Sequence, residues 1–157
     1  MKKWMALALV LVTVLTLVAC GETTWEAPLK SDWGTADGYN GKILGVWYNI
    51  EENASDETVY GFTADGDLLF AKSVDEKEAY SGFYTVDEET KTVFFYHADK
   101  ADPSKRGELA GTAQIVENGD VIYLIGENTK GEPIGMAREA DLDAARAAYP
   151  EIAKPAK

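Results

Sequence analysis

The stretch that decides the fold is Gly45-Val46-Trp47-Tyr48-Asn49-Ile50. It has the character of a β-strand, in which successive side chains face opposite sides of a sheet. A tryptophan preceded by glycine within such a run is typical of the strand that opens a small antiparallel barrel. We therefore expect the rest of the chain to supply further strands around this one.

From residue 43 onward the chain consists of eight short runs rich in Val, Ile, Phe, Tyr and Thr. No helical period occurs between residues 43 and 137, so the runs predict an antiparallel meander, because parallel strands need long crossovers. Asp65-Gly66 and Asn118-Gly119 predict tight hairpins, because Asn or Asp followed by Gly supplies the positive φ angles of such turns. The predicted strands are 43 to 50, 57 to 63, 67 to 72, 78 to 86, 91 to 97, 107 to 116, 120 to 126 and 133 to 138.

Eight strands in hairpin order favour a closed barrel, because closure leaves no unpaired edge. A barrel of this size is either filled by its own side chains or holds one small ligand. Small and apolar side chains on the sixth run predict free space inside, whereas Phe62, Phe70 and Phe83 would fill it, so both alternatives stay open. The sixth-run residues expected to point inward are Leu109, Gly111, Ala113 and Ile115.

Residues 93 to 96 and residues 121 to 125 are apolar on both faces, so the outer side of each needs a cover. Residues 139 to 149 supply one cover, because apolar side chains recur there at helical spacing and Pro150 prevents the helix from continuing. Residues 150 to 157 are expected to form a tail. The outer face left over, which we expect to be that of residues 93 to 96, is predicted to meet a protein partner or a second copy.

The stretch from Gly45 to Ile50 resembles the first strand of lipocalins, which carries a G-x-W motif followed by an aromatic and an aliphatic residue. The resemblance implies an all-β, small eight-stranded antiparallel up-and-down barrel over residues 43 to 149, with a short C-terminal helix. In lipocalins an arginine near the end of the eighth strand packs across the tryptophan, and Arg138 matches that position. Gly45, Trp47 and Arg138 are thus implied to close the barrel, through a cation–π contact. The alternative for Arg138 is a solvated strand end.

The resemblance also implies an interior that binds a ligand, with Trp47 at its closed end. We expect Phe62, Phe70 and Phe83 to contact the ligand as well. Two features depart from the family. The first connection, residues 51 to 56, is much shorter than the lid loop of lipocalins, and no threonine-aspartate-tyrosine motif precedes the seventh strand. We therefore expect a reduced lipocalin-like barrel with an open mouth or a small cavity.

The N-terminus has the pattern of an export signal. Lys2 and Lys3 precede an apolar stretch that is too short for a transmembrane helix of about 20 residues. The stretch ends in Leu17-Val18-Ala19-Cys20, which resembles the lipobox of bacterial lipoproteins. The resemblance implies that residues 1 to 19 are removed and that acyl chains on Cys20 anchor the protein to a membrane of the cell envelope.

Charge and cysteine content limit the partners of the mature chain. Two of the 15 Lys and Arg residues leave with residues 1 to 19 and all 27 Asp and Glu residues stay, so 13 positive against 27 negative charges leave −14. Nucleic acid is excluded as a partner by this acidity, and the membrane is contacted through the lipid on Cys20. Because Cys20 is the only cysteine, an internal disulfide is excluded too.

Residues 20 to 42 are predicted to form the lipidated N-terminus and a tether, because they have neither a helical nor a strand period. Trp25 and Trp33 would each expose a large ring to water in a free linker. We therefore expect part of this segment to fold back against one end of the domain, with a fully flexible linker as the alternative.

The sequence lacks the usual constellations for catalysis. His97 is the only histidine, and no serine lies in a Gly-x-Ser-x-Gly elbow. Acidic pairs such as Asp65 with Asp67 lack the spacing of a calcium loop. We predict a non-enzyme without metal or cofactor. Two functions stay open: a barrel that binds a small apolar ligand such as a fatty acid or lysolipid, and a protein-interaction module, an inhibitor or envelope adaptor, with a filled barrel.

Replacing Cys20 by serine tests the attachment. We expect the Cys20→Ser chain to leave the membrane fraction and to be processed poorly, because the thiol that would carry the lipid is gone. Cell fractionation with immunoblotting, run beside the wild-type chain, measures both effects. Unchanged membrane partition of the variant would contradict lipidation at Cys20.

Overall fold

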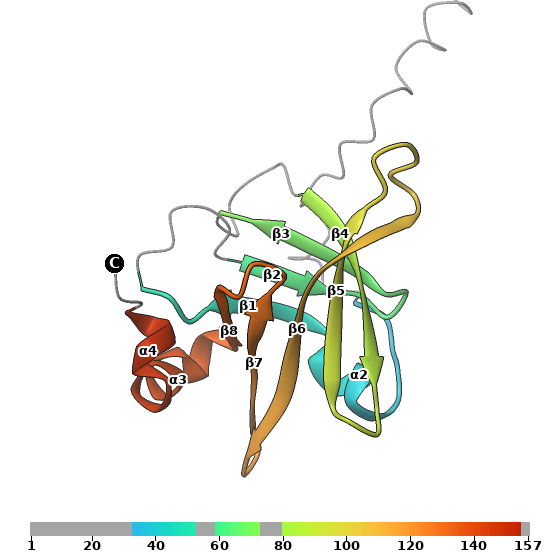
Figure 1. The fold of residues 1–157 in the computed structure, drawn as a ribbon. Coiled ribbons are helices and arrows are strands. Elements are labelled where there is room, and N and C mark those ends of the chain that lie inside the picture. The colour runs from blue at the N-terminus through green and yellow to red at the C-terminus, as the bar shows by residue number, and fades with distance from the viewer. Residues whose placement is uncertain (1–32, 53–58, 73–79, 155–157) are drawn as a thin grey trace, which may run out of the picture.

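The computed structural model describes residues 33–52, 59–72 and 80–154. Eight strands form one closed antiparallel barrel in which each pairs with the next along the chain and β8 pairs back with β1 (Figure 1). The predicted lipocalin-like up-and-down barrel is confirmed. The strands are β1 (Gly45–Asn49), β2 (Val59–Phe62), β3 (Asp67–Ala71), β4 (Tyr80–Asp87), β5 (Thr92–Ala98), β6 (Arg106–Asn118), β7 (Val121–Asn128) and β8 (Pro133–Ala137). The signal, Cys20 and Trp25 lie outside the described residues.

The two glycine turns form as predicted. Gly66 and Gly119 have φ angles of 89° and 64°, which are favourable for glycine alone. β2 pairs with β3 across the first turn, and β6 pairs with β7 across the second. The connection from β4 to β5 is fixed differently, because the Asp87 carboxylate accepts hydrogen bonds from the backbone N–H groups of Glu89 and Thr90, at 2.9 and 3.1 Å.

One expectation about the interior is wrong. Leu109 was predicted to point inward, but its side chain is 41% exposed. The pairing of β6 with β5 skips one residue, Ala110, because Leu109 and Gly111 pair with consecutive residues of β5. Such a β-bulge reverses the alternation of faces. Ala113 and Ile115 therefore lie in the core as predicted, while beyond the bulge Ala110 packs against the core and Leu109 faces outward.

The segment predicted as a tether contains a short helix, α2 (Gly38–Ile43). Ile43 is fully buried, and Tyr39 packs against the barrel core. Trp33 packs on the outer face of β1 to β3, where its carbonyl accepts a hydrogen bond from Ala64 N at 2.8 Å. Residues 33 to 43 thus fold back onto the domain, which extends further toward the N-terminus than the predicted boundary at residue 43.

The predicted C-terminal helix is confirmed as a 3₁₀ turn, η2 (Glu139–Asp141), followed by α3 (Leu142–Ala148). It covers the outer face of β7, where the rings of Tyr149 and Tyr123 lie 5.9 Å apart in a T-shaped arrangement. In the described part of the chain no helix is long and apolar enough to cross a membrane.

The segment predicted as a tail, residues 150 to 157, begins with a short helix. Pro150 opens a further helix, α4 (Pro150–Ala153), because a proline at the first position loses no hydrogen bond. Ile152 is 6% exposed and belongs to the cluster under α3. The C-terminal cover of the barrel therefore extends to residue 153.

Truncating Ile152 tests this extension. We expect Ile152→Ala to lower the free energy of unfolding by about 2 to 4 kcal/mol, because it leaves a cavity between α4 and the barrel. Glu151→Ala, at the exposed neighbouring position, is the matched control and should change it by less than about 0.5 kcal/mol. Denaturant titration of both variants measures the difference. Equal stabilities would mean that residues 150–153 are not part of the folded domain.

Candidate functional site

The topology gives the barrel two different ends (Figure 1). α2 lies at the end that carries the β2–β3, β4–β5 and β6–β7 turns, since it contacts Glu88 in the β4–β5 turn and Glu117 at the end of β6. The connections from β5 to β6 and from β7 to β8 lie at the other end. We call these the closed end and the open end.

Trp47 and Arg138 lie together at the closed end, as the resemblance implies. The guanidinium carbon of Arg138 lies 4.3 Å from the centroid of the Trp47 ring system. Trp47 is fully buried, and its Nε1 donates a hydrogen bond to the Ile43 carbonyl at 2.7 Å. Gly45, with a φ of 99°, leaves room for the guanidinium, because a Cβ there would lie 3.2 Å from Arg138 Nη1. The contact joins the segment after α2 to the end of β8.

Arg138 also completes the backbone hydrogen bonding where the barrel closes. β8 ends at Ala137, and it pairs with β1 only near the end of β1. Beyond that point the Arg138 side chain donates hydrogen bonds to the carbonyls of Val46 at 2.8 Å and Leu44 at 2.6 Å. Burial lowers the pKa of the guanidinium, and the charge of Asp141 opposes that effect. The Arg138 side chain therefore supplies the hydrogen-bond donors that the backbone of a longer β8 would supply at this position.

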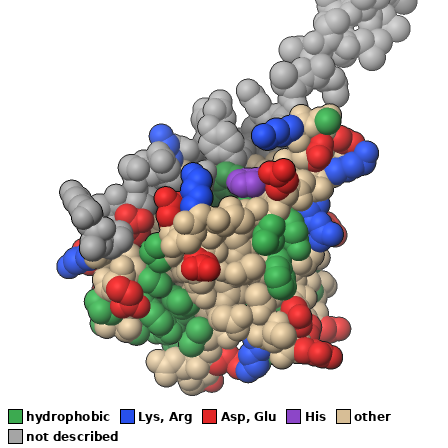
Figure 2. All heavy atoms as spheres, in the orientation of Figure 1, with side chains coloured by type: hydrophobic (Ala, Val, Ile, Leu, Met, Phe, Trp, Pro, Cys, Tyr) green, Lys and Arg blue, Asp and Glu red, His purple; other side chains and the backbone are tan. Residues whose placement is uncertain are grey.

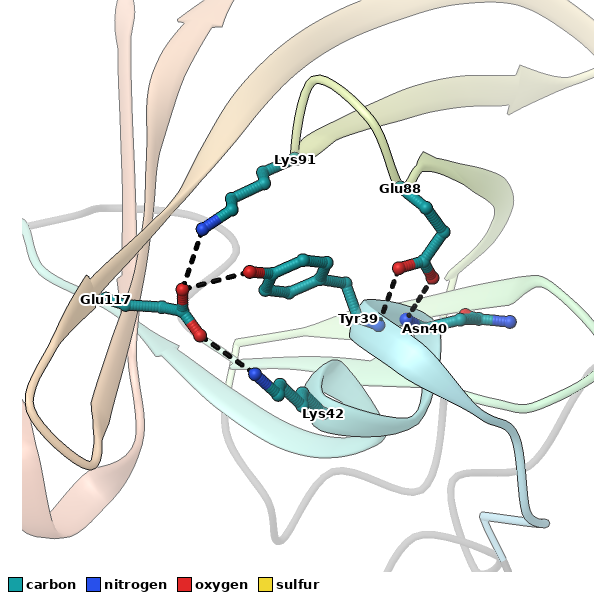
Figure 3. A network of polar contacts seen from close by, with 6 residues as sticks. All are labelled: Tyr39, Asn40, Lys42, Glu88, Lys91 and Glu117. Atoms are coloured by element: carbon teal, nitrogen blue, oxygen red, sulfur yellow. Dashed lines mark hydrogen bonds and ion pairs between the residues drawn. The ribbon is translucent and has the colours of Figure 1, made fainter.

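A second contact holds α2 against the barrel (Figure 3). Glu117, at the end of β6, accepts hydrogen bonds from Lys42 at 2.8 Å, from Lys91 at 2.8 Å and from the Tyr39 hydroxyl at 2.9 Å. These donors hold the pKa of the Glu117 carboxyl at about 2. Because both ion pairs are solvent-exposed, they orient α2 more than they stabilise it.

The first turn of α2 is held by Glu88. Its carboxylate accepts hydrogen bonds from the backbone N–H groups of Tyr39 at 2.9 Å and Asn40 at 3.1 Å, as Figure 3 shows. These are two of the N–H groups that a helix start leaves without an intrahelical partner, and Asp37 at the N-cap supplies no side-chain bond to them. The closed end is thus filled by α2 and by polar contacts from the β4–β5 turn and β6.

The open end contains a pocket of about 640 Å³. Its lining combines apolar side chains with polar residues, most of which lie near strand ends or in the β7–β8 connection. Such a lining resembles sites that hold a hydrophobic body and orient a polar head. The apolar lining consists of Leu68, Phe70, Phe95, Ala110, Pro133, Ile134 and Met136. The polar lining consists of Glu51, Tyr60, Tyr96, His97, Asn128, Thr129, Lys130 and Glu132.

The residues predicted to contact a ligand do not all lie at this pocket. Phe70 lines it. Trp47 and Phe62 are fully buried in the aromatic core, with their rings 6.2 Å apart, and are not among its lining residues. The expectation that Phe83 points inward is wrong, because its neighbour Tyr84 is in the core and successive strand residues face opposite sides.

Phe95 is one of the aromatic residues at the pocket that were not assigned to the interior from the sequence. It is 4% exposed, packs 6.2 Å from the Phe62 ring and lines the pocket. The alternation along residues 93 to 96 could not identify it, because Phe94 beside it is equally apolar.

Among the described residues no three His, Cys, Asp or Glu side chains come together as a metal site would require.

Comparison of the chain with protein-family models, with curated proteins and with solved structures gave no match. The lipocalin-like description therefore rests on the strand order of the barrel and on the contact between Trp47 and Arg138.

Replacing Arg138 by lysine tests the closure. Lysine keeps the charge but cannot donate to two carbonyls in fixed geometry, so at least one partly buried carbonyl loses its partner. We expect Arg138→Lys to lower the free energy of unfolding by about 2 to 3 kcal/mol. Arg106→Lys is the matched control, because Arg106 also lies over an aromatic ring, 4.5 Å from Tyr96, but is exposed. Denaturant titration showing similar small losses for both variants would contradict this role of Arg138.

Proposed function

We propose that this protein is an envelope lipoprotein, anchored through acyl chains on Cys20, whose barrel binds a small apolar ligand such as a fatty acid or lysolipid. The observation that carries the proposal is the pocket of about 640 Å³ at the open end. Its volume lies within the range of small-molecule sites, about 300 to 1,000 Å³. Its apolar inner wall suits a hydrocarbon chain, and its polar rim suits a head group. The function is binding rather than catalysis.

The bulge in β6 supports the proposal. It turns the small side chain of Ala110 toward the pocket and the larger Leu109 outward. If the alternation had continued without the bulge, Leu109 would occupy interior space. Small interior side chains of this kind distinguish a barrel that holds a ligand from one that is filled.

A protein-interaction module, such as an inhibitor or envelope adaptor, is the second candidate function. It is favoured by the outer face of β4 to β6, where Phe83 pairs across from Tyr96 and Tyr96 from Leu109. Leu109 is 41% exposed, and Figure 2 shows hydrophobic side chains gathered over β5 and β6. Tyr96 also lines the pocket, so the two functions use neighbouring parts of the same strands, and they do not exclude each other.

A binding titration, together with a substitution that fills the pocket, tests the proposed function. The mature chain with Cys20→Ser, which carries no acyl chain of its own, is titrated with a fluorescent fatty acid, and lysolipid is used to displace it. We expect saturable binding in the micromolar range, which corresponds to about 8 kcal/mol. Ala110→Phe should abolish binding by occupying the pocket. Leu109→Phe adds the same ring to the other face of β6 and should bind like the unsubstituted chain.

Two outcomes would contradict the proposal. One is the absence of saturable binding by a chain whose circular dichroism shows a folded barrel. The other is equal binding by the Ala110→Phe and Leu109→Phe chains, which would place the fatty acid on the outer surface.

A further inference from the structure

Two opposite charges at the rim of the pocket have no partner within the part of the chain that the structure describes. Lys130 and Glu51 both line the pocket, and among the described residues neither side chain has an ion pair or a hydrogen bond. Four other lysines in the described ranges do have a carboxylate partner. Those lysines are Lys42, Lys91, Lys105 and Lys154. The rim therefore holds one ammonium and one carboxylate that are available to a ligand.

The turn between β7 and β8, which carries Lys130, is fixed by Asn128. Asn128 Oδ1 accepts hydrogen bonds from the backbone N–H groups of Lys130 at 2.8 Å and Glu132 at 3.0 Å. Its Nδ2 donates to the Glu132 carboxylate at 2.6 Å. Asn128 thus fixes the turn and engages Glu132, and in the described ranges the Lys130 ammonium has no partner.

Glu51 is fixed at the rim through its backbone. Its N–H donates to Asn49 Oδ1 at 2.9 Å, and the N–H of Ile50 before it donates to the Gly135 carbonyl of β8 at 2.9 Å. Glu52 after it is held by α4, through an ion pair with Lys154 at 3.3 Å. The neighbours of Glu51 are therefore bound to β8 and α4, while its own carboxylate is not engaged.

The two charges lie on either side of β8. Glu51 follows β1 and Lys130 precedes β8, and β8 pairs with β1 on one edge and with β7 on the other. Figure 2 shows basic, acidic and histidine side chains close together at the upper end of the molecule, which is the open end in Figure 1. A ligand whose chain enters the pocket there would place its head group between them.

Resting on the proposed function, we propose that the ligand is a single-chain amphiphile with a zwitterionic head group, a lysophospholipid rather than a free fatty acid. The phosphate contacts Lys130 and the ammonium group contacts Glu51. A purely anionic head would satisfy Lys130 but would meet the carboxylates of Glu51 and Glu132 and the net charge of −14 of the mature chain. A zwitterion satisfies both charges. Because exposed ion pairs are weak, the charges set selectivity, and burial of the hydrocarbon chain provides most of the affinity.

The experiment compares four head groups on chains of matched length: palmitoyl lysophosphatidylcholine, palmitate, cetyltrimethylammonium and monopalmitoylglycerol. Each is titrated by calorimetry, below its micelle concentration, into the mature chain with Cys20→Ser. We expect the zwitterion to bind most tightly. Lys130→Gln should weaken the zwitterion and palmitate by about three- to fivefold and leave the neutral glyceride unchanged. Glu51→Gln should weaken the zwitterion and the cation by a similar factor and strengthen palmitate.

Lys100→Gln and Glu108→Gln serve as matched controls, because both residues are exposed and neither lines the pocket. If the four amphiphiles bind equally, or if Lys130→Gln and Glu51→Gln behave like the controls, the zwitterion assignment is overturned while binding in the barrel stands. If none of the four amphiphiles binds, the proposed function itself is overturned, and the assignment falls with it.

Discussion

Closure of the barrel depends on the stacking of Arg138 against Trp47. The strands β1 and β8 pair directly only at Tyr48 with Ala137 and at Asn49 with Met136, so most of β1 has no strand partner on that side. The carbonyls of Val46 and Leu44 would otherwise lack partners, and an unsatisfied buried carbonyl costs about 1 to 3 kcal/mol. One guanidinium satisfies both and covers the indole. This combination needs arginine, because lysine lacks a rigid set of donors.

The closure at one end determines what the other end can do. The rings of Phe62 and Tyr84 lie 5.0 Å apart, and α2 is held over this core by Glu117 and Glu88. Such dense packing leaves no path for a ligand from the closed end. The rigid aromatic floor also supports the pocket wall, because Phe95 belongs both to the core and to the pocket lining. Under the proposed function, an apolar ligand would therefore enter and leave at the open end, past the charged rim.

Much of this fold could be predicted from the sequence, because the strand period and the Asp-Gly and Asn-Gly turns are local signals. The resemblance added the position of Arg138. The errors at β6, in the tether and in the tail share a cause, since each depends on contacts between distant segments. The error at Phe83 is different, because Phe83 and Tyr84 are adjacent aromatic residues and the sequence does not tell which one faces inward. The bulge at Ala110 arises from pairing with β5, and α2 and α4 are too short to form without packing. The charges of Lys130 and Glu51 at the rim could not be predicted from the sequence, because contacts such as that of Asn128 with Glu132 form only in the folded turn.

The point at which the chain enters the barrel bears on how an anchored protein would reach its ligand. Trp33 bonds to Ala64 in the β2–β3 turn, so the chain from Cys20 enters at the closed end, opposite the pocket. The 13 residues from 20 to 32 can span at most about 45 Å at roughly 3.5 Å per residue. β6 also has 13 residues and, at about 3.3 Å per residue, is of similar length. If Cys20 carries a lipid as proposed, the open end can face either the bilayer or the aqueous compartment, as the proposed uptake and release of an amphiphile would require.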